Sequence, residues 1–151
     1  MNILKKLEKE LAQMELETLL NGKYDKHSCM LSIQCGLGGA DAQDWTSMLA
    51  RMYQRYAERK GFQVTILDLA QGEHGLKSID MRVEGSLAYG YLAREKGTHR
   101  LVRISPFNAL NKRQTSFAGV ETWPLLEDEE VTAIELVEKV KPFLFYNKTL
   151  F

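Results

Sequence analysis

The segment RISPFNALNKRQTSFAG, residues 103–119, combines residue types that suit the binding of single-stranded RNA. Pro106 fixes its own φ angle and favours an extended conformation at Ser105, so the Ser-Pro-Phe tip has few conformers to lose on binding. Phe107 offers a face on which a base can stack, and the small hydroxyls of Ser105 and Thr115 can donate or accept hydrogen bonds. The same segment could equally be a plain turn whose Phe107 packs into the core.

Basic residues cluster around this segment, although the formal net charge of the chain is zero. Residues 94–113 carry a single acid, Glu95, whereas residues 121–138 carry seven acids and no base. A local positive surface could bind the phosphates of a nucleic acid, and two solvated faces of opposite sign would give the same pattern. The bases close to the Ser-Pro-Phe tip are Arg100, Arg103, Lys112 and Arg113.

A second candidate site is the glycine-rich loop GLGGAD, residues 36–41, which follows a predicted strand and opens a predicted helix. Free N–H groups at a helix N-terminus can bind an anion or a base edge. Gly38 and Gly39 could place such donors, with Asp41 beside them as an acceptor and as the helix N-cap. The alternative is that the glycines only permit a tight turn and that Asp41 only caps. The loop lacks the Lys-Ser/Thr pair of a P-loop.

Signatures of common enzymes are absent from the sequence, which has no Gly-x-Ser-x-Gly, no P-loop and no His-Glu-x-x-His. His27, His74 and His99 are scattered and match no metal-ligand spacing. Cys29 and Cys35 end one predicted strand and lie roughly 20 Å apart in it, too far for a disulfide bond. We therefore predict no catalytic residue, no cofactor, no metal site and a reduced compartment.

The length of 151 residues and the 44% hydrophobic content fit one globular domain with a real core. No apolar stretch approaches the length of a membrane-spanning helix, and the N-terminus has no signal-peptide segment and is too acidic for a transit peptide. We expect a cytoplasmic protein without membrane contact. A plastid or mitochondrial location is the alternative if a transit peptide preceded this sequence.

Hydrophobic periodicity predicts an α+β fold, in which helices pack on a mostly antiparallel sheet and one amphipathic helix comes first. The first helix has an apolar stripe through Leu4, Leu7, Leu11 and Met14, so it needs a partner helix from this chain or from another, for example in a dimer. The predicted helices are residues 3–20, 41–60 and 86–95, and the predicted strands are residues 30–34, 62–66, 79–83, 98–104, 114–123 and 131–137.

Three stretches together resemble a known family: GGADAQDWTSMLARMYQRYAERKGF, AYGYLAREKGTHRLVRISPF and KRQTSF, in this order and spacing. They resemble the codon-recognition domain of bacterial-type class I peptide chain release factors, in particular the subtype that reads UAA and UGA with a Ser-Pro-Phe tripeptide. The resemblance divides the chain into a remnant helix of the family's N-terminal helical domain (1–24), the codon-recognition domain (25–138) and an atypical C-terminal tail (139–151).

The resemblance implies a decoding role, with the ribosomal decoding centre, its small-subunit rRNA and the stop codon of the mRNA as partners. In that family the Ser-Pro-Phe loop contacts the second and third codon bases, the helix tip after the double glycine reads the first uridine, and a threonine in the following strand assists. The residues that we expect to contact the codon or RNA are Ser105, Pro106, Phe107, Thr115, Gln114, Gly38, Gly39, Asp41, Arg100, Arg103 and Arg113.

The chain also departs from the family pattern. Gln114 replaces a histidine that stacks in the codon, and Asp41 replaces a glutamate. Asn108, Leu110 and Asn111 replace an aspartate and paired glycines in the loop. The Gly-Gly-Gln hydrolysis motif is absent from the sequence, so we expect no peptidyl-tRNA hydrolysis by the family mechanism. Two alternatives stay open, a repurposed paralogue that binds single-stranded RNA to stabilise or process a transcript, and a truncated non-functional product or interaction module.

Overall fold

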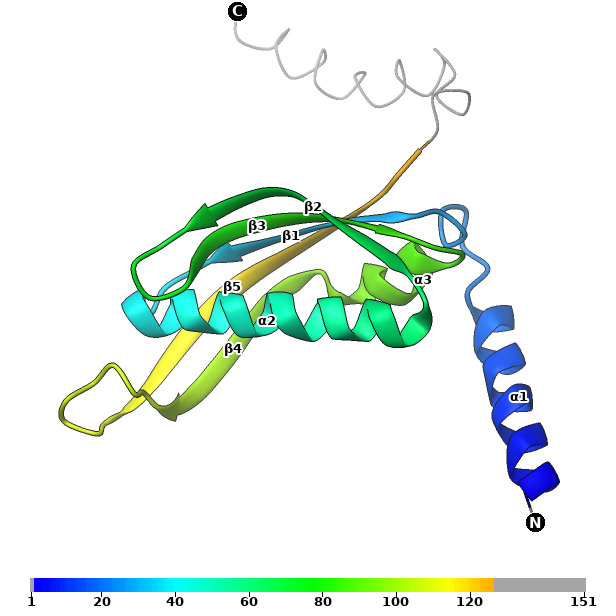
Figure 1. Cartoon of the computed structure of the whole chain (residues 1–151), viewed down its shortest axis with the longest axis horizontal. Coiled ribbons are helices and arrows are strands. Elements are labelled where there is room, and N and C mark those ends of the chain that lie inside the picture. The colour runs from blue at the N-terminus through cyan, green and yellow to red at the C-terminus, as the bar shows by residue number, and fades with distance from the viewer. Residues whose placement is uncertain (1, 127–151) are drawn as a thin grey trace, which may run out of the picture.

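The frame of the protein is a five-stranded antiparallel sheet, seen in a computed structural model that describes residues 2–126 (Figure 1). The strands run in the spatial order β2-β3-β1-β5-β4, and every neighbouring pair is antiparallel. This confirms the predicted α+β fold. The strands are β1 (Cys29–Cys35), β2 (Gln63–Gln71), β3 (Leu76–Glu84), β4 (Gly97–Ile104) and β5 (Arg113–Pro124).

The helical elements are α1 (Asn2–Leu19), α2 (Gly39–Lys60), α3 (Ala88–Leu92) and the short 3-10 turn η1 (Ala93–Glu95). The third predicted helix is therefore a short α-helix that continues as a 3-10 turn. The strand predicted at 131–137 and the tail 139–151 lie outside the described residues.

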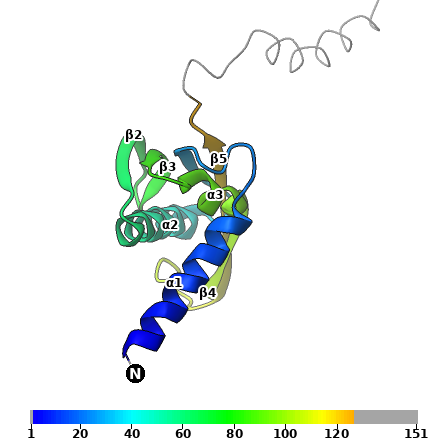
Figure 2. The same cartoon turned by 90° about the vertical axis from the view of Figure 1, so that its right-hand side faces the viewer.

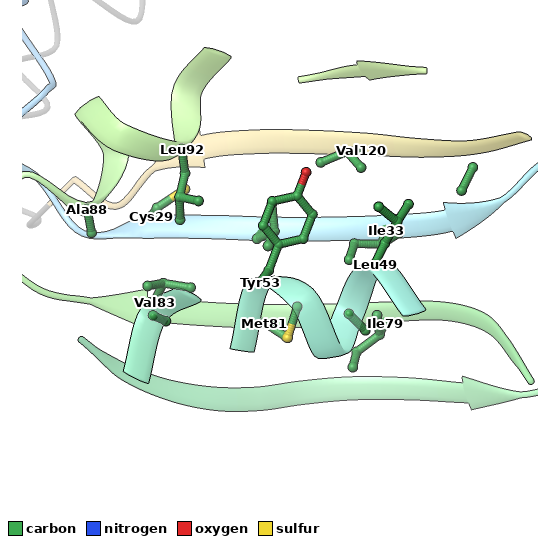
Figure 3. Close-up of a cluster of buried hydrophobic side chains, with 14 residues drawn as sticks. Cys29, Ile33, Leu49, Tyr53, Ile79, Met81, Val83, Ala88, Leu92 and Val120 are labelled. Atoms are coloured by element: carbon green, nitrogen blue, oxygen red, sulfur yellow. The ribbon is translucent and has the colours of Figure 1, made fainter. Parts of the chain in front are cut away.

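The core lies between one face of the sheet and α2, with α3 at its end (Figure 3). Strand alternation sends Leu31 and Ile33 of β1 to this face, where Leu49 and Tyr53 of α2 pack on them. Two methionines of α2 lie beside this core and not in it, since the side chain of Met52 is 47% exposed and that of Met48 also reaches solvent. The sheet therefore needs only a narrow strip of α2 to close its core.

Helix α2 starts two residues earlier than its sequence suggests. Its N-cap is Gly38 and it makes no side-chain capping hydrogen bond, so the prediction that Asp41 caps the helix is wrong. Asp41 lies inside the first turn, where its side chain is free to point toward other elements. The helix ends as predicted at Gly61, whose left-handed conformation (φ 75°) lets its N–H donate to the carbonyls of Ala57 and Glu58.

Helix α1 projects away from the rest of the described chain, as Figures 1 and 2 show. Its apolar stripe is exposed along its whole length, with 59% of Leu11 accessible, and within residues 2–126 no helix covers it. The amide of Gln13 donates a hydrogen bond to the hydroxyl of Tyr91 at 2.9 Å. The partner helix expected for this stripe remains a prediction.

Both cysteines are free, and burial raises the pKa of Cys29 to about 12. Within residues 2–126, no helix is long and apolar enough to cross a membrane. The same residues contain no group of three or more His, Cys, Asp or Glu side chains that could hold a metal ion.

A matched pair of leucine substitutions tests this division between core and exposed helix. Leu49→Ala should lower the free energy of unfolding by about 3 kcal/mol, because it removes a buried side chain from the core. Leu11→Ala should change it by less than about 0.5 kcal/mol, because that side chain already contacts water. Urea unfolding of the two variants measures both values, and equal losses would show that the stripe of α1 is packed.

Candidate nucleic-acid interface

The carboxylate of Asp41 joins three segments that are distant in sequence. It is 1% exposed, and its Oδ1 accepts hydrogen bonds from Arg103 Nη2 at 2.7 Å and from Ser105 Oγ at 3.0 Å. Its Oδ2 accepts a bond from Ser116 Oγ at 2.7 Å. The first turn of α2 is thereby tied to the end of β4, to the start of the Ser-Pro-Phe loop and to β5. We call Asp41, Arg103, Ser105 and Ser116 the Asp41 clamp.

The charge of Asp41 is stable in this buried position. Burial by itself raises the pKa of the carboxyl, but hydrogen bonds from Arg103, Ser116 and Ser105 outweigh it and hold the pKa below its ordinary value. Hydrogen bonds to Asp41 and Asp44 raise the pKa of Arg103 in turn. The Nη2 atom of Arg103 also lies 2.6 Å from Asp44 Oδ2, so the guanidinium bridges two carboxylates of one helix.

The glycine loop before α2 packs directly on β5. Gly36 N–H donates to the carbonyl of Phe117, and Phe117 N–H donates to the carbonyl of Leu37. Gly38 has a φ of 129°, and a Cβ on it would lie 2.6 Å from Ser116 Oγ. Both the backbone conformation and the close approach therefore require glycine at this position. Gly38 and Gly39 are exposed at the tip of the helix, beside the clamp.

The Ser-Pro-Phe loop is an ordered turn whose tip faces solvent. The hydroxyl of Ser105 donates to Asp41 and also accepts a bond from Phe107 N–H at 3.2 Å. The N–H of Asn108 donates to the carbonyl of Ser105, which closes the turn. Pro106 is exposed and the side chain of Phe107 is 43% exposed. The alternative of a turn with Phe107 packed into the core is therefore wrong.

The sheet register separates the other predicted contact residues. Gln114 pairs with Arg103, and the two share the face that α2 covers, whereas Thr115 pairs with Val102 on the opposite face. Arg113 and Arg100 also lie on the face of Thr115, and these three residues and Gln114 are all exposed. Arg100 is four positions from the end of β4, roughly 13 Å from the loop. The structure thus does not bring Arg100 to the tip.

Two predicted site residues take a different place from the one expected. The carboxylate oxygens of Asp41 already accept hydrogen bonds from Ser105 and Ser116 inside the protein, so they are not available to accept one from a ligand at the helix tip. Arg103 is bound by two carboxylates, so its charge is already neutralised and is not free for a phosphate. Sequence inspection missed Ser116 and Asp44. The signal for Asp44 was the Asp-x-x-Asp spacing on a helix, and the signal for Ser116 was strand alternation, which puts it on the same face as Ala118 and Val120.

Replacement of Asp41 tests the clamp. Asp41→Asn should lower the free energy of unfolding at neutral pH by about 3 kcal/mol, because Arg103 loses one of its two carboxylate partners and the new amide NH2 group faces hydrogen-bond donors. The folded-state pKa lies below the ordinary value, so the carboxylate stabilises the fold above that value and the effect is lost as the pH falls through the folded pKa. Unfolding of the variant should therefore depend less on pH in acid, as denaturant titrations would measure.

The control for this experiment is Asp68→Asn, at an exposed position of β2. This variant should leave the free energy of unfolding and its dependence on pH nearly unchanged. If the two variants lost equal stability, or if Asp41→Asn kept the full acid dependence, the clamp would not carry the charge described.

Comparison with known proteins agrees with this architecture. The family model of the PCRF domain matches residues 1–120. Peptide chain release factor 2 of Chloroflexus aggregans is 54% identical over 126 residues, which are 83% of this chain and 34% of that protein. The chloroplastic peptide chain release factor PrfB1 of Arabidopsis thaliana is 49% identical over 140 residues, 92% of this chain and 30% of the relative.

Among solved structures, RF2 of Thermus thermophilus superimposes with a TM-score of 0.79 at 45% sequence identity and covers 87% of this chain. The chain spans about a third of these relatives, namely 34% and 30% of the two sequences and 38% of the solved chain. Because the family model covers most of its length, the chain belongs to the peptide chain release factor family, as a PCRF domain of the release factor 2 type.

Proposed function

We propose that this chain recognises the stop codons UAA and UGA in the ribosomal A site. The observation that carries the proposal is that one residue of the Ser-Pro-Phe tripeptide anchors the loop while the other two are exposed. Ser105 is buried and bound to Asp41, while Pro106 is exposed and the side chain of Phe107 is partly exposed, on a turn with few conformers. A preorganised loop with an exposed ring is what base recognition in single-stranded RNA requires.

The other residues that we propose to contact the codon or RNA are those whose side chains or backbone are exposed near the Ser-Pro-Phe tip. The helix tip at Gly38 and Gly39 would approach the first codon base, and Gln114 and Thr115 would approach the codon from the two faces of β5. Arg113 is an exposed cation at the end of the loop and would neutralise a phosphate of the mRNA or of small-subunit rRNA. Asp41 and Arg103 would act as positioning residues that hold these groups in place.

The role that we propose for these residues is recognition. The sequence contains no Gly-Gly-Gln, and the matched region is the PCRF domain, so we assign no catalytic residue to this chain. We propose that residues 1–24 belong to the family's N-terminal helical domain, residues 25–138 to the codon-recognition domain and residues 139–151 to a separate segment. The relatives include bacterial proteins and a chloroplastic one, which favours a bacterial-type ribosome in a bacterial cytoplasm or a plastid.

Binding of the chain to programmed ribosomes tests this function. With UAA or UGA in the A site, the chain should bind more tightly than with a sense codon. Phe107→Ala should weaken stop-codon binding about tenfold, because a base loses its stacking surface. Leu110→Ala is the matched control, since this exposed side chain lies in the same loop and should have little effect. Equal binding to stop and sense codons would contradict the proposal.

One observation favours a second candidate, recognition of single-stranded RNA other than a stop codon. Gln114 is exposed beside the tip and offers an amide, which reads base edges but does not stack as an aromatic ring does. If this second candidate is correct, the native chain should bind free single-stranded RNA and show no preference for stop codons. Gln114→His would then be needed to restore that preference.

Salt dependence and a charge reversal separate the two candidates. Arg113→Glu should reduce affinity for free single-stranded RNA at least about tenfold at low salt, and should make affinity less sensitive to salt concentration, because a phosphate contact is lost. Arg103→Glu is unsuitable for this purpose, since it would place a third carboxylate beside Asp41 and Asp44. Fluorescence anisotropy with a labelled oligonucleotide gives the measurement, and an unchanged affinity would exclude the second candidate.

A further inference from the structure

The exposed ring of Phe107 contacts a second ring from a different part of the chain. The centroid of the His74 imidazole lies 5.2 Å from that of Phe107, with an angle of 52° between the two planes. Pairs of rings at this separation and tilt attract each other. Within residues 2–126, His74 supplies the one ring at stacking distance from Phe107. The contact therefore acts on the side chain that the proposed function depends on.

His74 belongs to the turn between β2 and β3, and this turn is fixed on α2. The N–H of His74 donates to Gln43 Oε1 at 3.1 Å, and the N–H of Leu76 donates to Ser47 Oγ at 3.0 Å. Gly72 N–H also donates to the carbonyl of Gly75, which closes the turn. Figure 1 shows the β2–β3 turn and the β4–β5 loop at the same end of the molecule, next to the start of α2.

The turn also packs closely on the helix through its two glycines. A Cβ on Gly72 would lie 2.3 Å from Gln43 Oε1, and a Cβ on Gly75 would lie 2.4 Å from the backbone oxygen of Gln43. A larger residue at position 75 would meet the backbone of α2 and would move the turn, whereas at position 72 it would displace only the end of the flexible Gln43 side chain. The first two turns of α2 consequently hold both rings, since Gln43 holds the turn of His74 while Asp41 holds Ser105 two residues before Phe107.

The hydrogen bonds of the Ser-Pro-Phe loop fix its backbone but not the direction of the ring. The side chain of a phenylalanine on a fixed backbone still has three staggered χ1 positions. The contact with His74 favours one of them. We propose that His74 is a positioning residue for Phe107, so that the β2–β3 turn is a third structural element of the reading surface, besides the tip of α2 and the Ser-Pro-Phe loop. This inference rests on the proposed function for its biological consequence, while the ring contact is a property of the free protein.

The contact itself is tested by NMR on the full chain without ribosomes. Nuclear Overhauser effects should connect the imidazole protons of His74 to the ring protons of Phe107. In Phe107→Ala, the imidazole protons should lose their ring-current shift, and in His74→Ala the χ1 couplings of Phe107 should become averaged. Glu73→Ala is the matched control, because this exposed neighbour in the same turn should change neither signal. Absence of the Overhauser effects would overturn the proposal whether or not the chain binds ribosomes.

Stop-codon-dependent ribosome binding tests the consequence. His74→Ala should weaken binding about 2- to 10-fold, the size expected for loss of one pair of rings. His74→Phe should restore binding, because it keeps a ring against Phe107, and His74→Ala should have no further effect in Phe107→Ala. If His74→Phe bound as weakly as His74→Ala, the positioning role would be wrong.

The two proposals fail in different ways. If Phe107→Ala weakened stop-codon binding but His74→Ala did not, the codon-reading function would hold and the positioning role of His74 would be overturned. If the native chain bound stop and sense codons equally, the codon-reading function would fail, and the NMR signals alone would decide whether His74 orients Phe107.

Discussion

The structure depends on one buried carboxylate. Removing Asp41 from water is costly, and the fold compensates by directing an arginine and two serine hydroxyls at it. These donors come from β4, from the loop that follows it and from β5, so none of these segments can move without exposing or unpairing a charge. The position of the Ser-Pro-Phe tip relative to the helix tip is therefore set by electrostatics inside the protein, before any ligand is present.

Neighbouring residues alternate between side chains that anchor the loop and exposed side chains that we propose to recognise RNA. Within one tripeptide, Ser105 faces inward while Pro106 and Phe107 face outward. On β5 the same separation follows from strand alternation, since Ser116 points into the clamp and Thr115 points to the other face. The loop is thus held by buried side chains, and the exposed side chains that we propose to contact RNA take no part in holding it.

A feature of this structure could be predicted from the sequence when it depends on residues close together in the chain, and not when it depends on residues far apart. Helix and strand periodicity is local, so the α+β fold and most element boundaries were predictable. The role of Asp41 was not, because a residue in the first turn of a helix is a local capping candidate and its actual partners depend on strand order. Arg103 was taken for a free cation for the same reason. His74 was one of three scattered histidines until the β2–β3 turn placed it beside Phe107.

The sequence separations within the Asp41 clamp also bear on how this surface forms. Asp41 lies 62 positions before Arg103, 64 before Ser105 and 75 before Ser116. Contacts of such long range close late, because the chain between them must first be ordered. A growing polypeptide that ends before β5 lacks one of the three donor segments and leaves the carboxylate incompletely paired. The proposed reading surface therefore forms only when nearly all of the described chain has folded, and it is lost as a unit rather than residue by residue.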